Sequence, residues 1–152
     1  MVSLKTIFWE VDVQADFMLP GGSLYIPGAE KIMANINLLV DAARQGRVFL
    51  ISSADAHNAN DPELSDWPPH CFKGTPAADL LPEACASPRL VIANQEGFTL
   101  PKDLGAYRQV TLEKKHARRV RQSTHRPALG AIAPHRLTRF CTSYFPSQNS
   151  RF

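Results

Sequence analysis

Residues 7–13 read IFWEVDV, a mostly apolar run that predicts a buried first strand. Between Ala29 and Ala43 apolar side chains recur at steps of three and four residues, and Gly46 follows where a glycine often ends a helix. Residues 48–51 read VFLI, a continuous apolar run typical of a strand covered on both faces. Strand, amphipathic helix and strand in this order predict a βαβ unit. We therefore expect an α/β fold with three layers, a mainly parallel sheet and right-handed crossovers.

The rest of the chain predicts fewer regular elements. Residues 54–88 are rich in proline and polar side chains, and we expect a long connection with one short helix around Ala77 to Leu81. Short apolar runs predict further strands at Leu90 to Ala93 and at Val110 to Leu112. Beyond Lys115 arginines interrupt every apolar stretch, so no strand or amphipathic helix is predicted there.

Charge separates the chain into two parts. The 152 residues hold 17 Lys+Arg and 14 Asp+Glu. All 14 acids lie in residues 1–115 together with 10 of the basic residues, whereas residues 116–152 hold seven arginines and no acid. Such a tail can neutralise phosphates, but it has no lysine, no Gly-Arg repeat and no helical stripe of charge. This composition argues against a nucleic-acid partner.

Length and cysteine usage narrow the class of protein further. A chain of 152 residues is long enough for one domain with a core. No run reaches the roughly 18 apolar residues of a membrane-spanning helix, and the first residues do not match a signal peptide, so we expect a cytoplasmic protein with no membrane partner. Cys71, Cys85 and Cys141 show no Cys-x-x-Cys spacing, so any chemistry they carry would use a free thiol.

Residues that can hold a metal follow the first two predicted strands. Asp12 ends the first strand, where open α/β sheets gather functional side chains, although such an aspartate can also cap a turn. Asp55 and His57 follow the second strand, and Glu63 and His70 lie further along the same loop. Two imidazoles and two carboxylates suit Zn²⁺, Fe²⁺ or Mn²⁺, with water in any open position. Glu63 can equally be a solvated loop residue.

Four motifs follow one another along the chain: VDVQADF at residues 11–17, GGSLYIPG at 21–28, DAH at 55–57 and WPPHCFKGTP at 67–76. Their residues, order and placement resemble the nicotinamidase branch of the isochorismatase-like cysteine hydrolases, over residues 6–115. The resemblance implies a Rossmann-like α/β domain and metal-dependent hydrolysis of a small amide, nicotinamide, to nicotinate and ammonia. Two alternatives stay open. One is a related hydrolase of another small amide or of an isochorismate-type substrate. The other is a catalytically dead metal-binding remnant that associates with other chains through its uncovered sheet. A homo-oligomer is a possible partner state.

The resemblance also implies roles for single residues. It implies a catalytic triad of aspartate, lysine and cysteine. In this triad the lysine ammonium lowers the pKa of the cysteine thiol, the aspartate takes the proton, and the thiolate attacks an amide carbonyl. Asp12 matches the acid, and Lys114 at the end of Leu112-Glu113-Lys114 matches the cation. Phe17 and Trp67 match the aromatic walls around the pyridine ring. The residues that match the ligands of the divalent metal are Asp55, His57 and His70, with Glu63 similar to an extra carboxylate ligand of some members.

The tail departs from this family. Thr138-Arg139-Phe140-Cys141 contains the Thr-x-x-Cys of the nucleophile turn, which makes Cys141 the candidate nucleophile, but no apolar strand precedes it and no glycine stands three residues before Thr138. One choice of codons for residues 117–125, read one base later, encodes Arg-Asp-Val-Phe-Asp-Asn-Pro-His, which resembles the stretch after the family's lysine. We therefore expect residues 116–152 to be a frameshift product that leaves the domain truncated at its carboxyl end. On this view Cys141 lies away from Asp12 and Lys114, and the chain is inactive.

Overall fold

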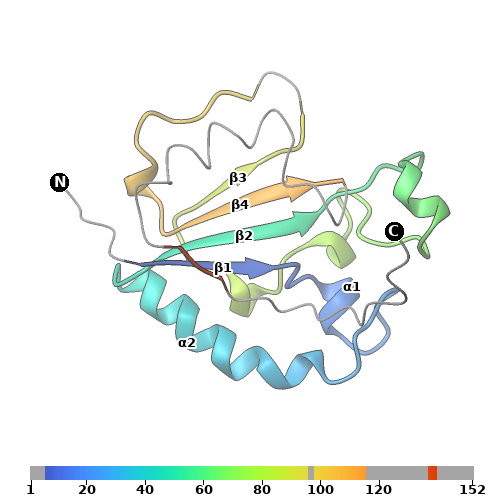
Figure 1. The fold of residues 1–152 in the computed structure, drawn as a ribbon, viewed down its shortest axis with the longest axis horizontal. Helices are drawn as coiled ribbons and strands as arrows, with labels where there is room; N and C mark the ends of the chain where they lie inside the picture. The colour runs from blue at the N-terminus through green and yellow to red at the C-terminus, as the bar shows by residue number, and fades with distance from the viewer. Residues whose placement is uncertain (1–5, 96–97, 116–136, 140–152) are drawn as a thin grey trace, which may run out of the picture.

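The computed structural model describes residues 6–95 and 98–115 and the backbone of residues 137–139. Its centre is a five-stranded sheet in the order β3-β4-β2-β1-β5, with every neighbouring pair parallel (Figure 1). The strands are β1 (Ile7–Val11), β2 (Phe49–Asp55), β3 (Arg89–Ile92), β4 (Gln109–Lys114) and β5 (Leu137–Arg139). The helices are α1 (Ala15–Met18) and α2 (Met33–Arg44), and single 3₁₀ turns span Ala29–Ile32, Pro62–Ser65, Pro76–Ala78, Pro82–Ala84 and Leu104–Ala106. The predicted α/β fold with a parallel sheet is confirmed.

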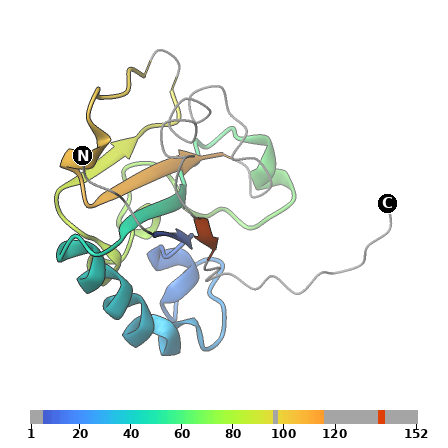
Figure 2. The ribbon, with the colours of Figure 1, turned by 60° about the vertical axis from the view of Figure 1, so that its left-hand side comes forward.

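Helix α2 covers one face of the sheet, as the views from two sides show (Figure 1, Figure 2). Its buried residues are Ile36, Val40 and Ala43, which recur at the predicted steps of three and four. They share one core cluster with Leu50 and Ala54 of β2. The apolar stripe of the helix therefore packs on the strand that follows it, which completes the predicted βαβ unit.

The opposite face of the sheet carries a second core cluster. Side chains of a strand alternate between the two faces, so the neighbours of Leu50 in β2, Phe49 and Ile51, point the other way. Their partners in this cluster are Ile7, Ile92, Val110 and Leu112, with Phe98, Leu100 and Leu104 packed against them. All seven residues of β2 are buried because this strand has neighbours on both edges and a core on both faces. Burial on both faces explains why residues 48–51 form a continuous apolar run.

The pattern beyond Lys115 predicts no strand, but the structure contains one there. Residues Leu137–Arg139 form β5, which pairs in parallel with the free edge of β1, Leu137 opposite Ile7 and Arg139 opposite Trp9 (Figure 2). This pairing uses backbone N–H and C=O groups, so a segment of three residues can pair without an apolar pattern. The rest of the frameshift and truncation hypothesis, and the expected position of Cys141, lie outside the described residues.

The short helix expected around Ala77 to Leu81 is only partly present. A 3₁₀ turn spans Pro76–Ala78, Leu81 is extended with a ψ of 140°, and a second 3₁₀ turn spans Pro82–Ala84. The physical reason is Pro82, because the ring of a proline disfavours helical backbone in the residue before it. No helix in the described part of the chain is long and apolar enough to cross a membrane.

Candidate active site

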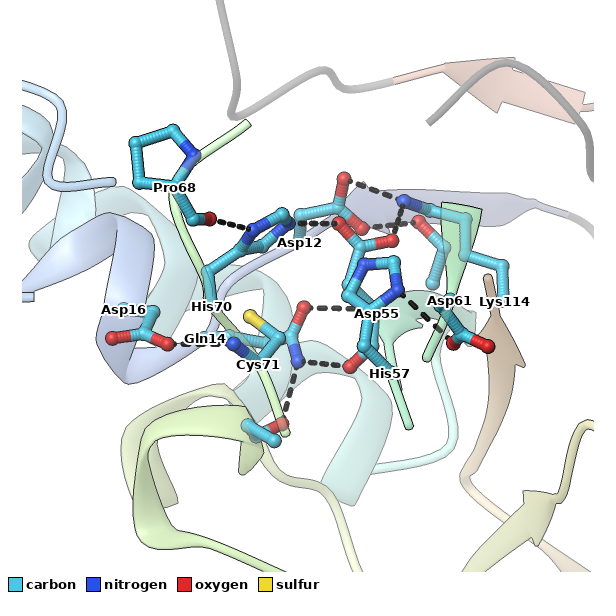
Figure 3. A network of polar contacts seen from close by, with 12 residues as sticks. Asp12, Gln14, Asp16, Asp55, His57, Asp61, Pro68, His70, Cys71 and Lys114 are labelled. Atoms are coloured by element: carbon cyan, nitrogen blue, oxygen red, sulfur yellow. Dashed lines mark hydrogen bonds and ion pairs between the residues drawn. The ribbon is translucent and has the colours of Figure 1, made fainter. Parts of the chain in front are cut away.

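Three charged side chains meet at the carboxyl ends of the neighbouring strands β1, β2 and β4 (Figure 3). The Nζ atom of Lys114 lies 3.0 Å from Oδ2 of Asp12 and 2.5 Å from Oδ1 of Asp55. The register explains the meeting: Asp55 is paired with Lys114 in neighbouring strands, and Asp12 directly follows β1. All three residues are buried, with 5% or less of their surface exposed. The predicted pair of Asp12 and Lys114 is thus brought together, with Asp55 as a third member.

The backbone at Asp12 is held in an unusual conformation. Its φ is 56°, in the left-handed region that costs a residue with a side chain on the order of 1 kcal/mol. The Asp12 N–H donates to the carbonyl oxygen of Ser53 at 3.0 Å, and the Ser53 hydroxyl donates to Oδ1 of Asp12 at 3.1 Å. These two bonds hold the turn so that the carboxylate of Asp12 faces Lys114 rather than solvent.

Burial and neighbouring charges set the protonation of this cluster. Burial raises the pKa of Asp12 to about 6, although the ammonium of Lys114 opposes the rise. Burial alone would also raise the pKa of Asp55, but the adjacent His70 and Lys114 hold it below its ordinary value. Burial would lower the pKa of Lys114, yet the carboxylates of Asp12 and Asp55 raise it. Lys114 therefore stays a cation, while a carboxyl group with the pKa of Asp12 can exchange protons at mildly acidic to neutral pH.

Asp55, His57 and His70 bring one ligand atom each within 4.8 Å of one another, and all three residues are buried. His70 Nε2 lies 3.8 Å from Oδ2 of Asp55, the oxygen that does not face Lys114. His57 Nε2 is buried without a hydrogen-bond partner among the described residues. A first-row divalent metal fits this donor set, because it would take the orphaned nitrogen, the second imidazole and a carboxylate oxygen together.

Three other predicted site residues lie in the same region but outside this group. Glu63 is half-buried in the 3₁₀ turn Pro62–Ser65, and its negative charge acts on His70. Phe17 is buried, with its ring edge-on to the ring of His70 at 5.6 Å between centroids. Trp67 is 44% exposed in the loop that leads to His70. An aromatic ring beside a candidate ligand and another one open to solvent agree with pocket walls, and the roles of all three stay predictions.

Two buried polar residues at the site had no role assigned from the sequence. The Gln14 side chain donates to the carbonyl oxygens of Asp55 at 2.7 Å and Ala78 at 2.5 Å, and accepts from the Asp55 N–H at 2.7 Å. Asp16 accepts from the N–H of Cys71 at 2.7 Å and from the N–H of Ser23 at 2.9 Å. Gln14 thus fixes the backbone of Asp55, and Asp16 fixes the backbone next to His70. The signal that could have found them is two polar side chains in an otherwise apolar, buried segment.

The cysteines of the described chain are not prepared for nucleophilic attack. Cys71 is fully buried beside the charged cluster, and burial raises the pKa of its thiol far above the usual range. Burial also raises the pKa of Cys85, which lies half-buried behind helix α2. Cys141, the predicted nucleophile, lies outside the described residues. Strand β5 is parallel to β1, so its carboxyl end is directed toward the same end of the sheet as the carboxyl end of β1, which Asp12 follows.

Comparison with known proteins gives matches in sequence and in fold. The model of the isochorismatase domain matches residues 7–99. The nicotinamidase/pyrazinamidase of Mycobacterium tuberculosis is 40% identical over 78 residues, which are 47% of this chain and 41% of that protein. The chain therefore spans less than half the length of this curated relative.

Solved structures share the fold at lower identity. The N-carbamoylsarcosine amidase of Thermoplasma acidophilum has a TM-score of 0.66 at 19% identity, with 90% of this chain and 67% of that chain covered. The pyrazinamidase of Pyrococcus horikoshii, solved in complex with zinc, has a TM-score of 0.59 at 22% identity, with 90% and 70% covered. These structures contain the same arrangement of sheet and helices as this chain.

Proposed function

The chain belongs to the isochorismatase domain family, and we propose that it hydrolyses the carboxamide of a small pyridine, nicotinamide, to nicotinate and ammonia. The observation that carries this proposal is the buried ammonium of Lys114 between the carboxylates of Asp12 and Asp55, beside two histidines with clustered ligand nitrogens. The 40% identity to a nicotinamidase/pyrazinamidase over 78 residues supports the choice of amide.

A frameshifted tail would leave the chain inactive. We propose instead that Cys141 is the nucleophile, because β5 is parallel to β1 and its carboxyl end is directed toward the end of the sheet at which Asp12 lies. The residues then divide the reaction between them. The thiol of Cys141 gives its proton to Asp12, and the thiolate, stabilised by the charge of Lys114, forms a bond to the amide carbon. When the C–N bond breaks, the nitrogen takes the proton back from Asp12 and leaves as ammonia. Water then hydrolyses the thioester, which releases the carboxylic acid and restores the thiol. The pKa of about 6 at Asp12 suits both proton transfers near neutral pH.

The metal site serves to bind and orient the substrate. We propose Asp55, His57 and His70 as ligands of Zn²⁺, Fe²⁺ or Mn²⁺, with Glu63 as a further carboxylate ligand, direct or through water. When bound, the metal would supply a Lewis acid for the lone pair of the pyridine nitrogen. The rings of Phe17 and Trp67 hold the pyridine between them. A ring held at both its nitrogen and its faces presents the carboxamide to the sulfur in one orientation, and this positioning lowers the barrier.

Ammonia release from the full chain loaded with Zn²⁺, Mn²⁺ or Fe²⁺ tests the proposal. Nicotinamide is compared with benzamide, which carries the same amide but lacks the ring nitrogen. We expect release from nicotinamide, at least about 100-fold slower release from benzamide because the metal contact is lost, and no release from the Cys141→Ala variant. The Cys85→Ala variant is the matched control and keeps its rate.

Each part of the proposal has an outcome that contradicts it. Ammonia release that survives Cys141→Ala would exclude Cys141 as the nucleophile. Equal rates with nicotinamide and benzamide would exclude the role of the metal in binding the ring. A metal-loaded chain that releases no ammonia from nicotinamide would overturn the proposed activity.

A further inference from the structure

His57 uses its two ring nitrogens differently. Its Nδ1 lies 3.3 Å from Oδ2 of Asp61, four residues further along the loop (Figure 3). Its Nε2 is buried and meets no hydrogen-bond partner in the part of the chain that the structure describes. The His57 side chain is completely buried, so water at the protein surface does not reach either nitrogen. The ring therefore has one bonded nitrogen and one free nitrogen, and His57 belongs to the group that could hold a metal.

Asp61 is itself held in place from three directions. Its Oδ2 accepts from the backbone N–H of Asn58 at 2.9 Å, and its own N–H donates to the carbonyl oxygen of Asn58 at 3.0 Å. Its Oδ1 lies 3.9 Å from Nζ of Lys115, the residue that follows the end of β4. The carboxylate is thus fixed between the loop after β2 and the end of β4, with about 10% of its side chain exposed.

We propose that Asp61 is a positioning residue for the metal, one that keeps His57 in the tautomer with hydrogen on Nδ1 and the lone pair on Nε2. A neutral imidazole carries one N–H, and a carboxylate beside Nδ1 accepts that hydrogen. The remaining lone pair on Nε2 is then directed into the space shared with Asp55 and His70. Carboxylates that act on a metal in this indirect way raise its affinity about 10- to 100-fold. This inference rests on the metal site of the proposed function.

His70 supplies a comparison within the same site. Its Nδ1 lies 2.8 Å from the carbonyl oxygen of Pro68, and its Nε2 faces Asp55. The two histidines therefore share one arrangement, Nδ1 on an oxygen acceptor and Nε2 toward the metal position. The acceptor of His70 is backbone and no substitution of a side chain removes it, whereas the acceptor of His57 is the side chain of Asp61. A change at Asp61 should alter the tautomer of His57 and leave that of His70 unchanged.

The test measures the tautomers and the metal separately in the full chain. Ring ¹⁵N chemical shifts of ¹⁵N-histidine-labelled, metal-free protein report which nitrogen carries hydrogen, and His57→Gln and His70→Gln variants assign the signals. Zn²⁺ affinity comes from competition with a chelating fluorophore. We expect Asp61→Ala to move His57 away from the Nδ1–H tautomer and to weaken Zn²⁺ binding about 10- to 100-fold. Asp61→Asn, which keeps a weaker neutral acceptor and the turn around Asn58, should give intermediate values of both quantities.

Asp66→Asn, an exposed acid of the same loop, is the matched control and should change neither quantity. A purely structural role for Asp61 predicts that both histidines change together or that neither does, and either result would overturn the inference. An Nε2–H tautomer of His57 in the unsubstituted metal-free chain would overturn it directly. If His57 and His70 both hold the Nδ1–H tautomer and the chain binds no Zn²⁺, the proposed function fails at its metal site, and the two failures are therefore distinguishable.

Discussion

The same three strands, β1, β2 and β4, carry two buried polar clusters that are built differently. The inner cluster consists of Glu10, Ser52 and Gln109: Oε1 of Glu10 accepts from the Ser52 hydroxyl at 2.5 Å and from Nε2 of Gln109 at 2.8 Å. Among the described residues Arg89 lowers the pKa of Glu10 through its charge, without a hydrogen bond to it. The outer cluster, at the strand ends, has two carboxylates and the ammonium of Lys114.

The difference shows how a buried acid can be made tolerable in two ways. Burial raises the pKa of Glu10 to about 7, against the opposing effect of Ser52 and Gln109, so that a proton removes much of its charge near neutral pH. Gln109 also donates to the carbonyl oxygen of Ala84 at 2.9 Å and accepts from the N–H of Ala86 at 2.7 Å, which ties the loop to the sheet. The inner cluster therefore has a structural role. The outer cluster keeps its charges, so its two buried carboxylates would destabilise the fold if Lys114 were absent, but its charged groups can take part in a reaction.

Replacing Lys114 by Met should have the largest effect, because it leaves two buried carboxylates without their cation. Removing one partner of a buried ion pair costs about 3–5 kcal/mol, and we expect the free energy of unfolding to fall by about 4 kcal/mol at pH 7. The loss should shrink as the pH falls and the two carboxylates take up protons. Urea unfolding at pH 7 and pH 5 measures both values. Lys115→Met, at the neighbouring half-buried position, should cost less than about 1 kcal/mol; similar losses at both positions would mean that the outer cluster is not charged.

Replacing Glu10 by Gln should remove a pH dependence that belongs to the inner cluster. The pKa of Glu10 in the folded chain, about 7, lies above its ordinary value of 4.5, so the folded state holds the proton more strongly than the unfolded state. The stability from this group is complete below pH 4.5 and is lost as the pH rises through 7, by up to about 3 kcal/mol. Urea unfolding between pH 5 and pH 8 should show a decline that Glu10→Gln reduces and the exposed control Glu83→Gln keeps. Parallel curves for all three proteins would show that Glu10 is ionised throughout.

Replacing Gln14 by Ala tests whether the outer cluster needs a scaffold. The change leaves the buried N–H and C=O of Asp55 without their partner, which we expect to cost about 2 kcal/mol. Hydrogen exchange at the Asp55 amide should become faster, and Zn²⁺ binding should weaken because Asp55 is a proposed ligand. Gln45→Ala, at the exposed end of helix α2, serves as the control. Unchanged exchange at Asp55 would show that the strand pairing alone holds this residue.

Replacing Cys71 by Ala should have the smallest effect, because its thiol is a buried apolar group rather than a member of the charged cluster. We expect a loss of about 1 kcal/mol in the free energy of unfolding, from the missing sulfur contacts. Burial raises the pKa of this thiol, so iodoacetamide should modify Cys71 in the urea-unfolded chain and leave it unmodified in the folded chain at pH 7.5. Rapid modification of Cys71 in the folded chain would place a reactive thiolate next to Asp12 and contradict the assignment of roles.

Sequence reasoning reached the parts of the site that are local in the chain. Asp12 and Asp55 stand at the ends of strands with clear apolar patterns, and His57 and His70 lie in a motif of characteristic residues. Gln14 and Asp61 were missed, because their roles depend on which groups the fold places opposite them: Gln14 bonds to residues 41 and 64 positions away. Strand β5 was missed because backbone pairing needs no side-chain pattern. Periodicity thus predicts strands and helices, and it does not predict the partners that fix a side chain.

The order of the strands in the sheet has a consequence for the chain while it is being made. β1 leaves the ribosome first, but its second neighbour, β5, comes from residues 137–139. The roughly 20 residues between β4 and β5 take about one to four seconds to synthesise at about 5–20 residues per second. During that time the outer edge of β1 presents N–H and C=O groups that another nascent chain can pair with. Slow codons between positions 115 and 136 would lengthen this interval, so the speed of translation, and not only the final stability, sets how much chain is lost to aggregation.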